Sequence, residues 1–204
     1  MLCFLIIILE NYEVTQQQYQ VIMGTNPSYF EKCDDCPVEN VSWEDIQLFL
    51  RKLNQKLGKN YRLPTEAEWE YTARSRGKNT MFGNGKNIIK SNDVNFHADV
   101  GKKFYSELGV SRKRTIPVGS LNSPNSLGVH DMSGNVWEWC QDWYGDYTYG
   151  SKTNPTGAYY GDSRVLRGGS WSTDPPSCRT SYRNYNAIDK KFNTVGFRLA
   201  LSVQ

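Results

Sequence analysis

Histidine is scarce in this chain, which limits the metal chemistry that the sequence supports. The chain has only two histidines, His97 and His130, and neither has a second histidine two or four residues away. Catalytic zinc and non-haem iron sites usually take most of their protein ligands from histidine. The sequence therefore disfavours a zinc or iron site of that kind.

The chain also lacks an excess of charge of one sign. Lysine and arginine together number 24 against 21 aspartates and glutamates, and the formal net charge is +3. The small basic cluster Arg112-Lys113-Arg114 is typical of a solvated turn. Because nucleic acids and anionic membranes attract concentrated basic surfaces, we expect neither as a partner.

The apolar run from Leu2 to Leu9 is too short to span a bilayer, which takes about 20 residues. No basic residue precedes it and no small-residue cleavage site follows it, so it lacks the marks of a signal peptide. We interpret it as a buried strand and expect no membrane insertion by this chain. A remnant of a longer leader, or a truncated start, is the alternative. Localisation stays open, with the cell surface or a virion as candidates.

Cysteines are too few for a dense disulfide framework, and their number is odd. They are Cys3, Cys33, Cys36, Cys140 and Cys178. The pair at 33 and 36 forms a single CxxC, which is weak support for zinc because a second pair is missing. Pro37 follows directly and blocks the helix that a thioredoxin-like site needs. We interpret this motif as a local disulfide or two free thiols.

Aromatic residues (13%) and 17 glycines are abundant, and the mean hydropathy is −0.64. These values predict short turns and much loop around an aromatic core. A length of 204 residues favours a single domain that covers residues 1–204. Residues 74–120 are expected to form a long, partly ordered loop. The alternating pattern over 195–201 predicts a strand that pairs with the N-terminal strand.

Three segments carry the start signals of helices. Thr15 is a candidate N-cap of a short helix that ends at Gly24, and Thr65, with a glutamate three residues later, begins another. Ser42 is a candidate N-cap of the main helix, which Gly58 ends. The main helix has apolar residues at helical spacing: Ile46, Phe49, Leu50, Leu53 and Leu57.

Two glycine-flanked motifs, Gly134–Trp139 and Arg167–Trp171, organise the rest of the chain. On a strand, Trp137 and Trp139 share one face and Glu138 points to the other. A carboxylate placed between two tryptophans is poorly hydrated and needs a cation, an arginine or backbone N–H donors. We therefore predict a rigid platform built from these motifs, with the polar segment after Trp171 displayed on it.

Calcium is the one ion that these motifs suggest. Asn135 and Glu138, with carbonyl oxygens of the turn at Gly134, offer the hard oxygen ligands that calcium prefers. The alternative is that Glu138 binds backbone N–H groups or an arginine. No other cofactor is indicated by the residues themselves.

Six motifs together resemble the signatures of the formylglycine-generating enzyme (sulfatase-modifying factor) family. They occur in order at 12–15, 37–43, 61–70, 134–139, 167–171 and 195–198. The resemblance implies an α+β fold, the formylglycine-generating-enzyme-like variant of the C-type lectin fold. Its features would be small twisted antiparallel sheets, two main helices and much irregular loop.

The enzymes of this family oxidise a sulfatase cysteine, and the resemblance implies a copper ion held by two cysteines shortly after the Gly-Gly-Ser turn. In this sequence those positions fall on Thr173 and Cys178. Copper(I) prefers soft thiolate ligands, and here one of the two is missing. The resemblance thus implies the scaffold and argues against the reaction. A copper-dependent oxidase using Cys178 with another thiol, such as Cys140, is the enzyme alternative.

Residues 172–194 resemble the variable region of proteins diversified by retroelements, of the treponeme variable protein type. In that group, mutation at template adenines changes Asn codons into codons for other residues. The positions between these variable sites stay fixed. Trp171, Arg179, Arg183, Gly196 and Phe197 are similar to the fixed positions. The residues that we expect to bind a ligand are Ser172, Thr173, Asp174, Ser177, Thr180, Tyr182, Asn184, Tyr185, Asn186, Phe192, Asn193 and Thr194.

The composition of this segment suits recognition. Tyr182, Tyr185 and Phe192 offer large contact areas at low entropy cost, with small polar residues between them for adaptable hydrogen bonds. We therefore hypothesise a non-catalytic protein that binds a protein or cell-surface ligand through residues 172–194. An ordinary surface loop is the alternative for this segment. A structural module of a surface or virion assembly is compatible with the hypothesis.

Overall fold

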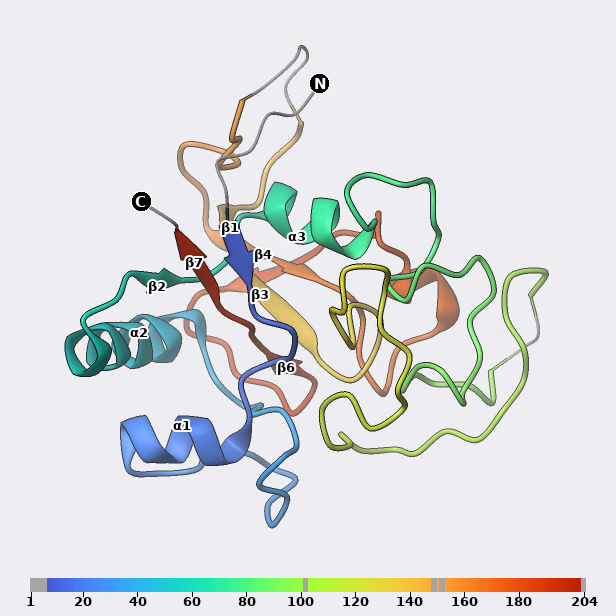
Figure 1. Ribbon diagram of the computed structural model, residues 1–204, viewed down its shortest axis with the longest axis horizontal. Helices are drawn as coiled ribbons and strands as arrows, with labels where there is room; N and C mark the ends of the chain where they lie inside the picture. Colours follow the sequence, from blue (N-terminus) through green and yellow to red (C-terminus); the bar gives the residue numbers. More distant parts are fainter. Residues whose placement is uncertain (1–6, 101–102, 148–149, 151–152, 203–204) are drawn as a thin grey trace.

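The computed structural model describes residues 7–100, 103–147, 150 and 153–202. Its α-helices are α1 (Gln16–Met23), α2 (Trp43–Leu57) and α3 (Glu66–Ala73), and a 3-10 helix, η1, covers Pro175–Cys178. Helices α1 and α2 lie on one side of the molecule, and long irregular loops lie on the other (Figure 1). The α+β class with small sheets and much loop is confirmed. Among the described residues, no helix has the length and apolar character that crossing a membrane requires.

All three α-helices begin where the sequence placed a capping residue. The side chains of Thr15, Ser42 and Thr65 each accept a hydrogen bond from the backbone amide three residues further on. In return, the side chain of that later residue accepts a hydrogen bond from the backbone amide of the capping residue. Gly24 and Gly58 end α1 and α2 in the left-handed conformation, with φ of 84° and 62°. Local capping chemistry therefore fixes the bounds of these helices.

The chain termini meet in a three-stranded antiparallel sheet of order β1-β7-β2. Its strands are β1 (Ile7–Leu9), β7 (Ala200–Ser202) and β2 (Tyr61–Arg62). The predicted pairing of the N-terminal and C-terminal strands is confirmed for the described residues, whereas the part of the apolar run before residue 7 lies outside them.

A second sheet of order β5-β4-β3-β6 carries the two glycine-flanked motifs. Its strands are β3 (Trp137–Trp143), β4 (Ser163–Arg167), β5 (Asn184–Ala187) and β6 (Val195–Gly196). The pairs β3–β4 and β4–β5 are antiparallel, but β3 and β6 are parallel. The expectation of purely antiparallel sheets was therefore wrong at this one pair.

The predicted single strand over 195–201 was also wrong, because the structure divides it between the two sheets. β6 pairs with β3, β7 pairs with β1, and residues 197–199 pass between them. Between the two strands, the side chain of Arg198 is fully buried and turns toward β3.

The irregular chain between α3 and β3 is well packed, although no helix or strand is assigned to its described residues. It forms an apolar cluster of its own that also includes Cys178 from η1. The other members are Phe82, Ile89, Val94, Phe96, Ala98 and Tyr105. This region is therefore a second part of the core and supports the segment that follows the Gly-Gly-Ser turn.

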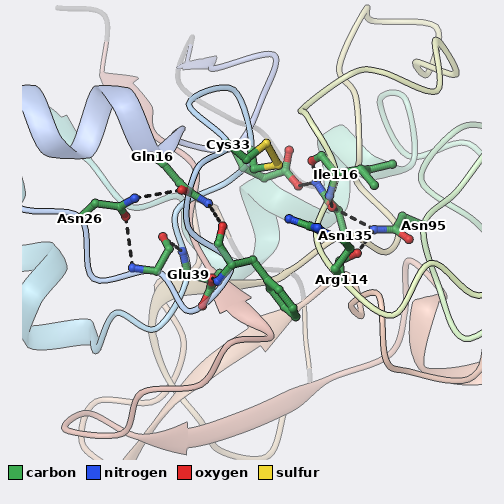
Figure 2. Close-up of a disulfide and its surroundings, with 12 residues drawn as sticks. Gln16, Asn26, Cys33, Glu39, Asn95, Arg114, Ile116 and Asn135 are labelled. Atoms are coloured by element: carbon green, nitrogen blue, oxygen red, sulfur yellow. Dashed lines mark hydrogen bonds between the residues drawn. A yellow bond between two sulfur atoms is a disulfide. The ribbon is translucent and has the colours of Figure 1, made fainter.

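The CxxC motif forms a disulfide, which is one of the two predicted outcomes. Cys33 and Cys36 are joined (Figure 2). The Cys36 carbonyl accepts a hydrogen bond from the Gln16 amide at the start of α1. Cys140 and Cys178 are free and buried. Cys3 lies outside the described residues.

The central sheet is built around a buried carboxylate. Trp137 and Trp139 share one face of β3 and pack in the main core cluster, as the sequence predicted. Glu138 faces the other way and is 0% exposed. Its carboxylate binds the Arg198 guanidinium through two bonds of 2.6 Å and accepts the Trp69 indole N–H at 2.7 Å. Of the predicted partners for this carboxylate (a cation, an arginine or backbone N–H donors), the structure shows an arginine, Arg198.

We expect that Arg198→Met lowers the free energy of unfolding by about 3–5 kcal/mol, because Glu138 would be left buried without its cation. Adding Glu138→Leu to the same chain should return part of the loss, since two apolar side chains can replace a buried pair. Urea unfolding followed by tryptophan fluorescence measures both. A loss below about 1 kcal/mol for Arg198→Met would contradict the role assigned to the pair.

Candidate ligand-binding face

Residues 172–194 begin at a turn that only glycine can make. Gly168 and Gly169 have φ of 100° and 78°, in the left-handed region. A Cβ atom at Gly169 would stand 2.7 Å from the sulfur of Cys178. From this turn the chain enters η1, forms β5 at the edge of the second sheet, and returns to the core at β6. The segment is thus held at both ends and in the middle.

The three large aromatic side chains predicted to contact a ligand are all exposed. Tyr182, Tyr185 and Phe192 are 42%, 51% and 41% accessible. The smaller candidates that the structure leaves exposed are Ser172 and Asp174. Those that it half-buries are Ser177, Asn184, Asn186, Asn193 and Thr194. Most of the candidate residues therefore reach solvent, and β5 presents its outer edge there.

Thr180 does not lie on this face, so its assignment as a ligand-binding residue was wrong. It is only 1% exposed, and its hydroxyl donates to the Thr80 carbonyl. Its own carbonyl accepts from the Arg167 guanidinium at 2.6 Å. Thr173 is also turned inward, because its hydroxyl accepts from the Ser170 amide and donates to the Ser170 carbonyl. Both threonines stabilise the segment from beneath.

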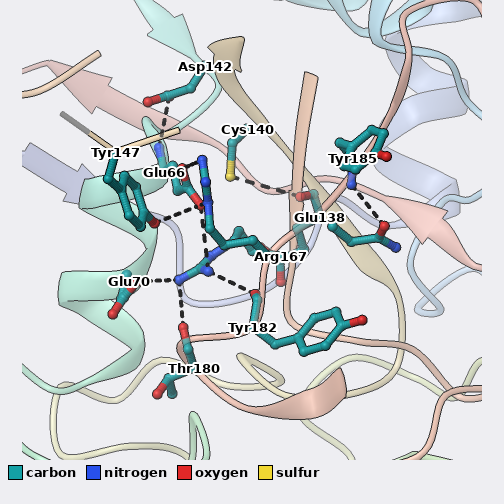
Figure 3. A network of polar contacts seen from close by, with 12 residues as sticks. Glu66, Glu70, Glu138, Cys140, Asp142, Tyr147, Arg167, Thr180, Tyr182 and Tyr185 are labelled. Carbon is teal, nitrogen blue, oxygen red and sulfur yellow. Dashed lines mark hydrogen bonds and ion pairs between the residues drawn. The ribbon is translucent and has the colours of Figure 1, made fainter. Parts of the chain in front are cut away.

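Two arginines tie the middle of the segment to the core, as Figure 3 shows for Arg167. Arg167 is fully buried and donates to the carbonyls of Tyr182 and Thr180, and it pairs with Glu70 of α3. Arg183 binds both carboxylate oxygens of Glu66 in α3, at 2.7 and 2.8 Å. Glu66 and Glu70 of α3 therefore position residues 180–183.

Aromatic side chains outside 172–194 extend the face, and sequence reasoning missed them. Tyr144 stacks on Tyr185 with ring centroids 4.2 Å apart. The Arg183 guanidinium lies over the rings of Tyr144 and Tyr147, at 4.7 and 4.1 Å. The tyrosine-rich composition of residues 144–147 is the signal that could have indicated them. The pairing of these segments is long-range, so no local pattern placed them next to Tyr185.

Thr173 and Cys178, the positions at which the family resemblance implies two copper-binding cysteines, lie together in space. The hydroxyl oxygen of Thr173 is 3.5 Å from the sulfur of Cys178. Burial raises the pKa of the Cys178 thiol to about 12, so this group is a poor thiolate. One hydroxyl and one protonated thiol do not match the two soft thiolates that copper(I) prefers. This donor pair does not fit copper.

Cys140 and Cys178 belong to different apolar clusters. Cys140 lies on β3 in a cluster with Trp69 and Val165, whereas Cys178 belongs to the cluster around Phe82. Burial raises the pKa of the Cys140 thiol well above its usual value. The alternative in which Cys178 works with Cys140 therefore joins two buried thiols from separate clusters, both with raised pKa values.

The expected calcium ligands are used by other partners, which corrects that expectation. Both carboxylate oxygens of Glu138 bind Arg198, which was the stated alternative. The Asn135 side-chain oxygen accepts from Asn95 at 3.2 Å and from the Ile116 amide at 3.1 Å (Figure 2). In the part of the chain that the structure describes, no group of three His, Cys, Asp or Glu residues is arranged to hold a metal ion.

Comparison with known proteins places this geometry in a family. The family model described as "Sulfatase-modifying factor enzyme 1-like domain" matches residues 6–203. The formylglycine-generating enzyme of Streptomyces coelicolor is 33% identical over 172 residues, which is 80% of this chain and 52% of that protein. The chain therefore spans about half the length of this curated relative.

Among the solved structures that are similar to this fold are two with differing degrees of likeness. Treponema denticola variable protein 1 superposes with a TM-score of 0.84 and 28% identity, over 97% of this chain and 84% of that one. The Major Tropism Determinant U1 variant superposes with a TM-score of 0.52 and 16% identity, over 95% of this chain and 50% of that one. The first likeness is close along nearly the whole chain, whereas the second concerns the fold alone.

Arg183→Ala should loosen residues 180–187 while leaving the sheet core intact, because the two bonds to Glu66 are lost. Hydrogen exchange measured residue by residue should show faster exchange there and unchanged rates in α2. Arg62→Ala is the matched control, since Arg62 forms the same kind of two-bond pair with Glu68 of α3 and does not touch the segment. Equal effects of both variants on 180–187 would contradict the assigned role.

Proposed function

This chain belongs to the sulfatase-modifying factor enzyme 1-like family, and we propose that it is a non-catalytic ligand-binding member. The observation that carries the proposal is the Thr173–Cys178 pair, in which a hydroxyl stands where the enzyme needs a second thiolate. The fold of the family is kept, while one of the two thiolate ligands that the copper-dependent reaction needs is absent. A conserved fold does not by itself carry an activity, so the site decides.

The binding face in this proposal is the outer surface of residues 172–194. Exposed Tyr182, Tyr185 and Phe192 supply rigid apolar area, and the small polar residues between them supply hydrogen bonds. Thr180 is excluded from the face and Thr173 contributes only through its backbone and turn. A protein or cell-surface ligand suits such a surface better than a small molecule, because its large aromatic side chains are exposed at the surface.

We further propose that a retroelement diversifies this face. The likeness to Treponema denticola variable protein 1 over 97% of the chain supports a diversified binding protein. The separation of exposed positions from the buried anchors Arg167 and Thr180 fits this, because exposed residues can change without disturbing the core. An imperfect repeat of the 3′ end of the gene beside a reverse transcriptase gene is the genomic mark of this process.

The second candidate function is a copper-dependent formylglycine-generating oxidase. It is favoured by the 33% identity to the Streptomyces coelicolor enzyme and by the retention of Cys178. It requires a second soft ligand at the position of Thr173. The two candidates therefore differ in one measurable property, which is tight binding of copper(I).

Copper(I) titration against a chelator separates them, with Cys33 and Cys36 changed to serine so that the reduced CxxC cannot bind the ion. We expect no tight one-to-one binding and no oxidation of a thiol peptide under oxygen. Thr173→Cys is the matched positive control, because it adds a sulfur beside Cys178 and should gain affinity. Tight copper(I) binding and turnover by the protein with Thr173 and Cys178 unaltered, both lost in Cys178→Ala, would refute the proposal.

A further inference from the structure

A cavity of about 300 Å³ opens beside the start of the binding face. Its lining residues are His97, Ser111, Lys113, Trp171 and Ser172. Ser172 is the first residue of the face, and Trp171 is the fixed aromatic residue before it. The other three come from the irregular chain between α3 and β3, some sixty to seventy-five residues earlier. Small-ligand pockets have volumes of about 300–1,000 Å³, and this cavity lies at the low end of that range. It therefore suits one side chain of a partner.

The walls of this cavity are held in place without a ligand. The Trp171 indole donates to the Asn193 carbonyl at 3.1 Å and packs edge-on against Phe30. The His97 amide donates to the Thr173 carbonyl at 3.0 Å, which ties the two sides of the cavity together. A site whose walls are fixed in advance loses little entropy when it binds.

Lys113 brings a positive charge to the cavity lining, close to the carboxylate of Asp99. Lys113 is exposed and stands between Arg112 and Arg114 in the sequence. The acid that faces this cluster is Asp99, whose carboxylate binds His97 at 2.7 Å and accepts the Ser111 hydroxyl at 2.7 Å. Asp99 is therefore engaged by the cavity wall, and the Lys113 ammonium forms no ion pair with the described acidic residues.

We propose that this cavity is an anion-binding subsite that accepts the carboxylate of an aspartate or glutamate side chain of a partner protein. Lys113 supplies the charge, Ser172 supplies a hydroxyl group, and the Trp171 ring contacts the methylene groups of the incoming side chain. The inference rests on the proposed function in one respect, namely that the partner on residues 172–194 is a protein. The anion site itself needs only the cavity.

The test is nuclear magnetic resonance of the indole N–H signals, with Trp171 assigned through Trp171→Phe. The probe is N-acetylglutamate α-amide, and its neutral isostere N-acetylglutamine α-amide is the ligand control, at constant ionic strength. We expect the Trp171 signal to shift saturably with the acid and hardly with the amide. Lys113→Glu and the milder Lys113→Gln should weaken binding about tenfold or more, since a charge-assisted contact is lost.

Lys52→Gln is the matched control, because Lys52 is an exposed lysine of α2 that lies outside the binding face and does not line the cavity. It should leave binding unchanged. Equal shifts with acid and amide, or an equal effect of Lys113→Gln and Lys52→Gln, would overturn the proposal. Inorganic phosphate binding at least tenfold tighter than the acid would overturn its carboxylate assignment. Copper turnover would refute the non-catalytic function alone, whereas these results concern only the subsite.

Discussion

The buried ion pair between Glu138 and Arg198 is the interaction on which the rest of this structure depends. It joins β3 to the chain between β6 and β7, and the same guanidinium donates to the carbonyls of Glu10, Asn11 and His130. Because both charges are fully buried, each must have its partner or the core becomes unfavourable. One contact therefore fixes the N-terminal chain, the central strand and the C-terminal chain relative to one another.

A second arginine connects the central sheet to the backbone of the binding face. Arg167 lies directly opposite Glu138 in the β3–β4 register, and its side chain reaches outward to the carbonyls of residues 180 and 182. The backbone of the binding face is thus held by groups that do not depend on which side chains it displays. Side chains such as Tyr185 can then vary in chemistry while the backbone beneath them stays fixed. This separation of anchoring from display is what a protein needs if its binding residues are to change.

Local chemistry made part of this architecture predictable. The caps at Thr15, Ser42 and Thr65 indicated the three helices. The carboxylate between Trp137 and Trp139 indicated that it needed a cation, an arginine or backbone N–H donors as its partner. The partner is Arg198, which lies sixty residues further along the chain, and its identity follows from packing alone. For the same reason the parallel β3–β6 pair and the burial of Thr180 were missed, since each depends on contacts between distant segments. The polar character of Asn135 and Glu138 was read correctly, but their partners are protein groups rather than calcium.

The most direct test of this account is to change the displayed positions together and measure thermal unfolding. The positions are Ser172, Asp174, Tyr182, Tyr185 and Phe192, varied among Asn, Ser, Thr, Asp, Tyr, Ala, Ile and Phe. If anchoring and display are separate, most combinations should unfold cooperatively within about 5 °C of the parent, because exposed substitutions change stability little. If most combinations lose cooperative unfolding or fall far below that range, residues 172–194 hold the fold together, and a role in variable display is contradicted.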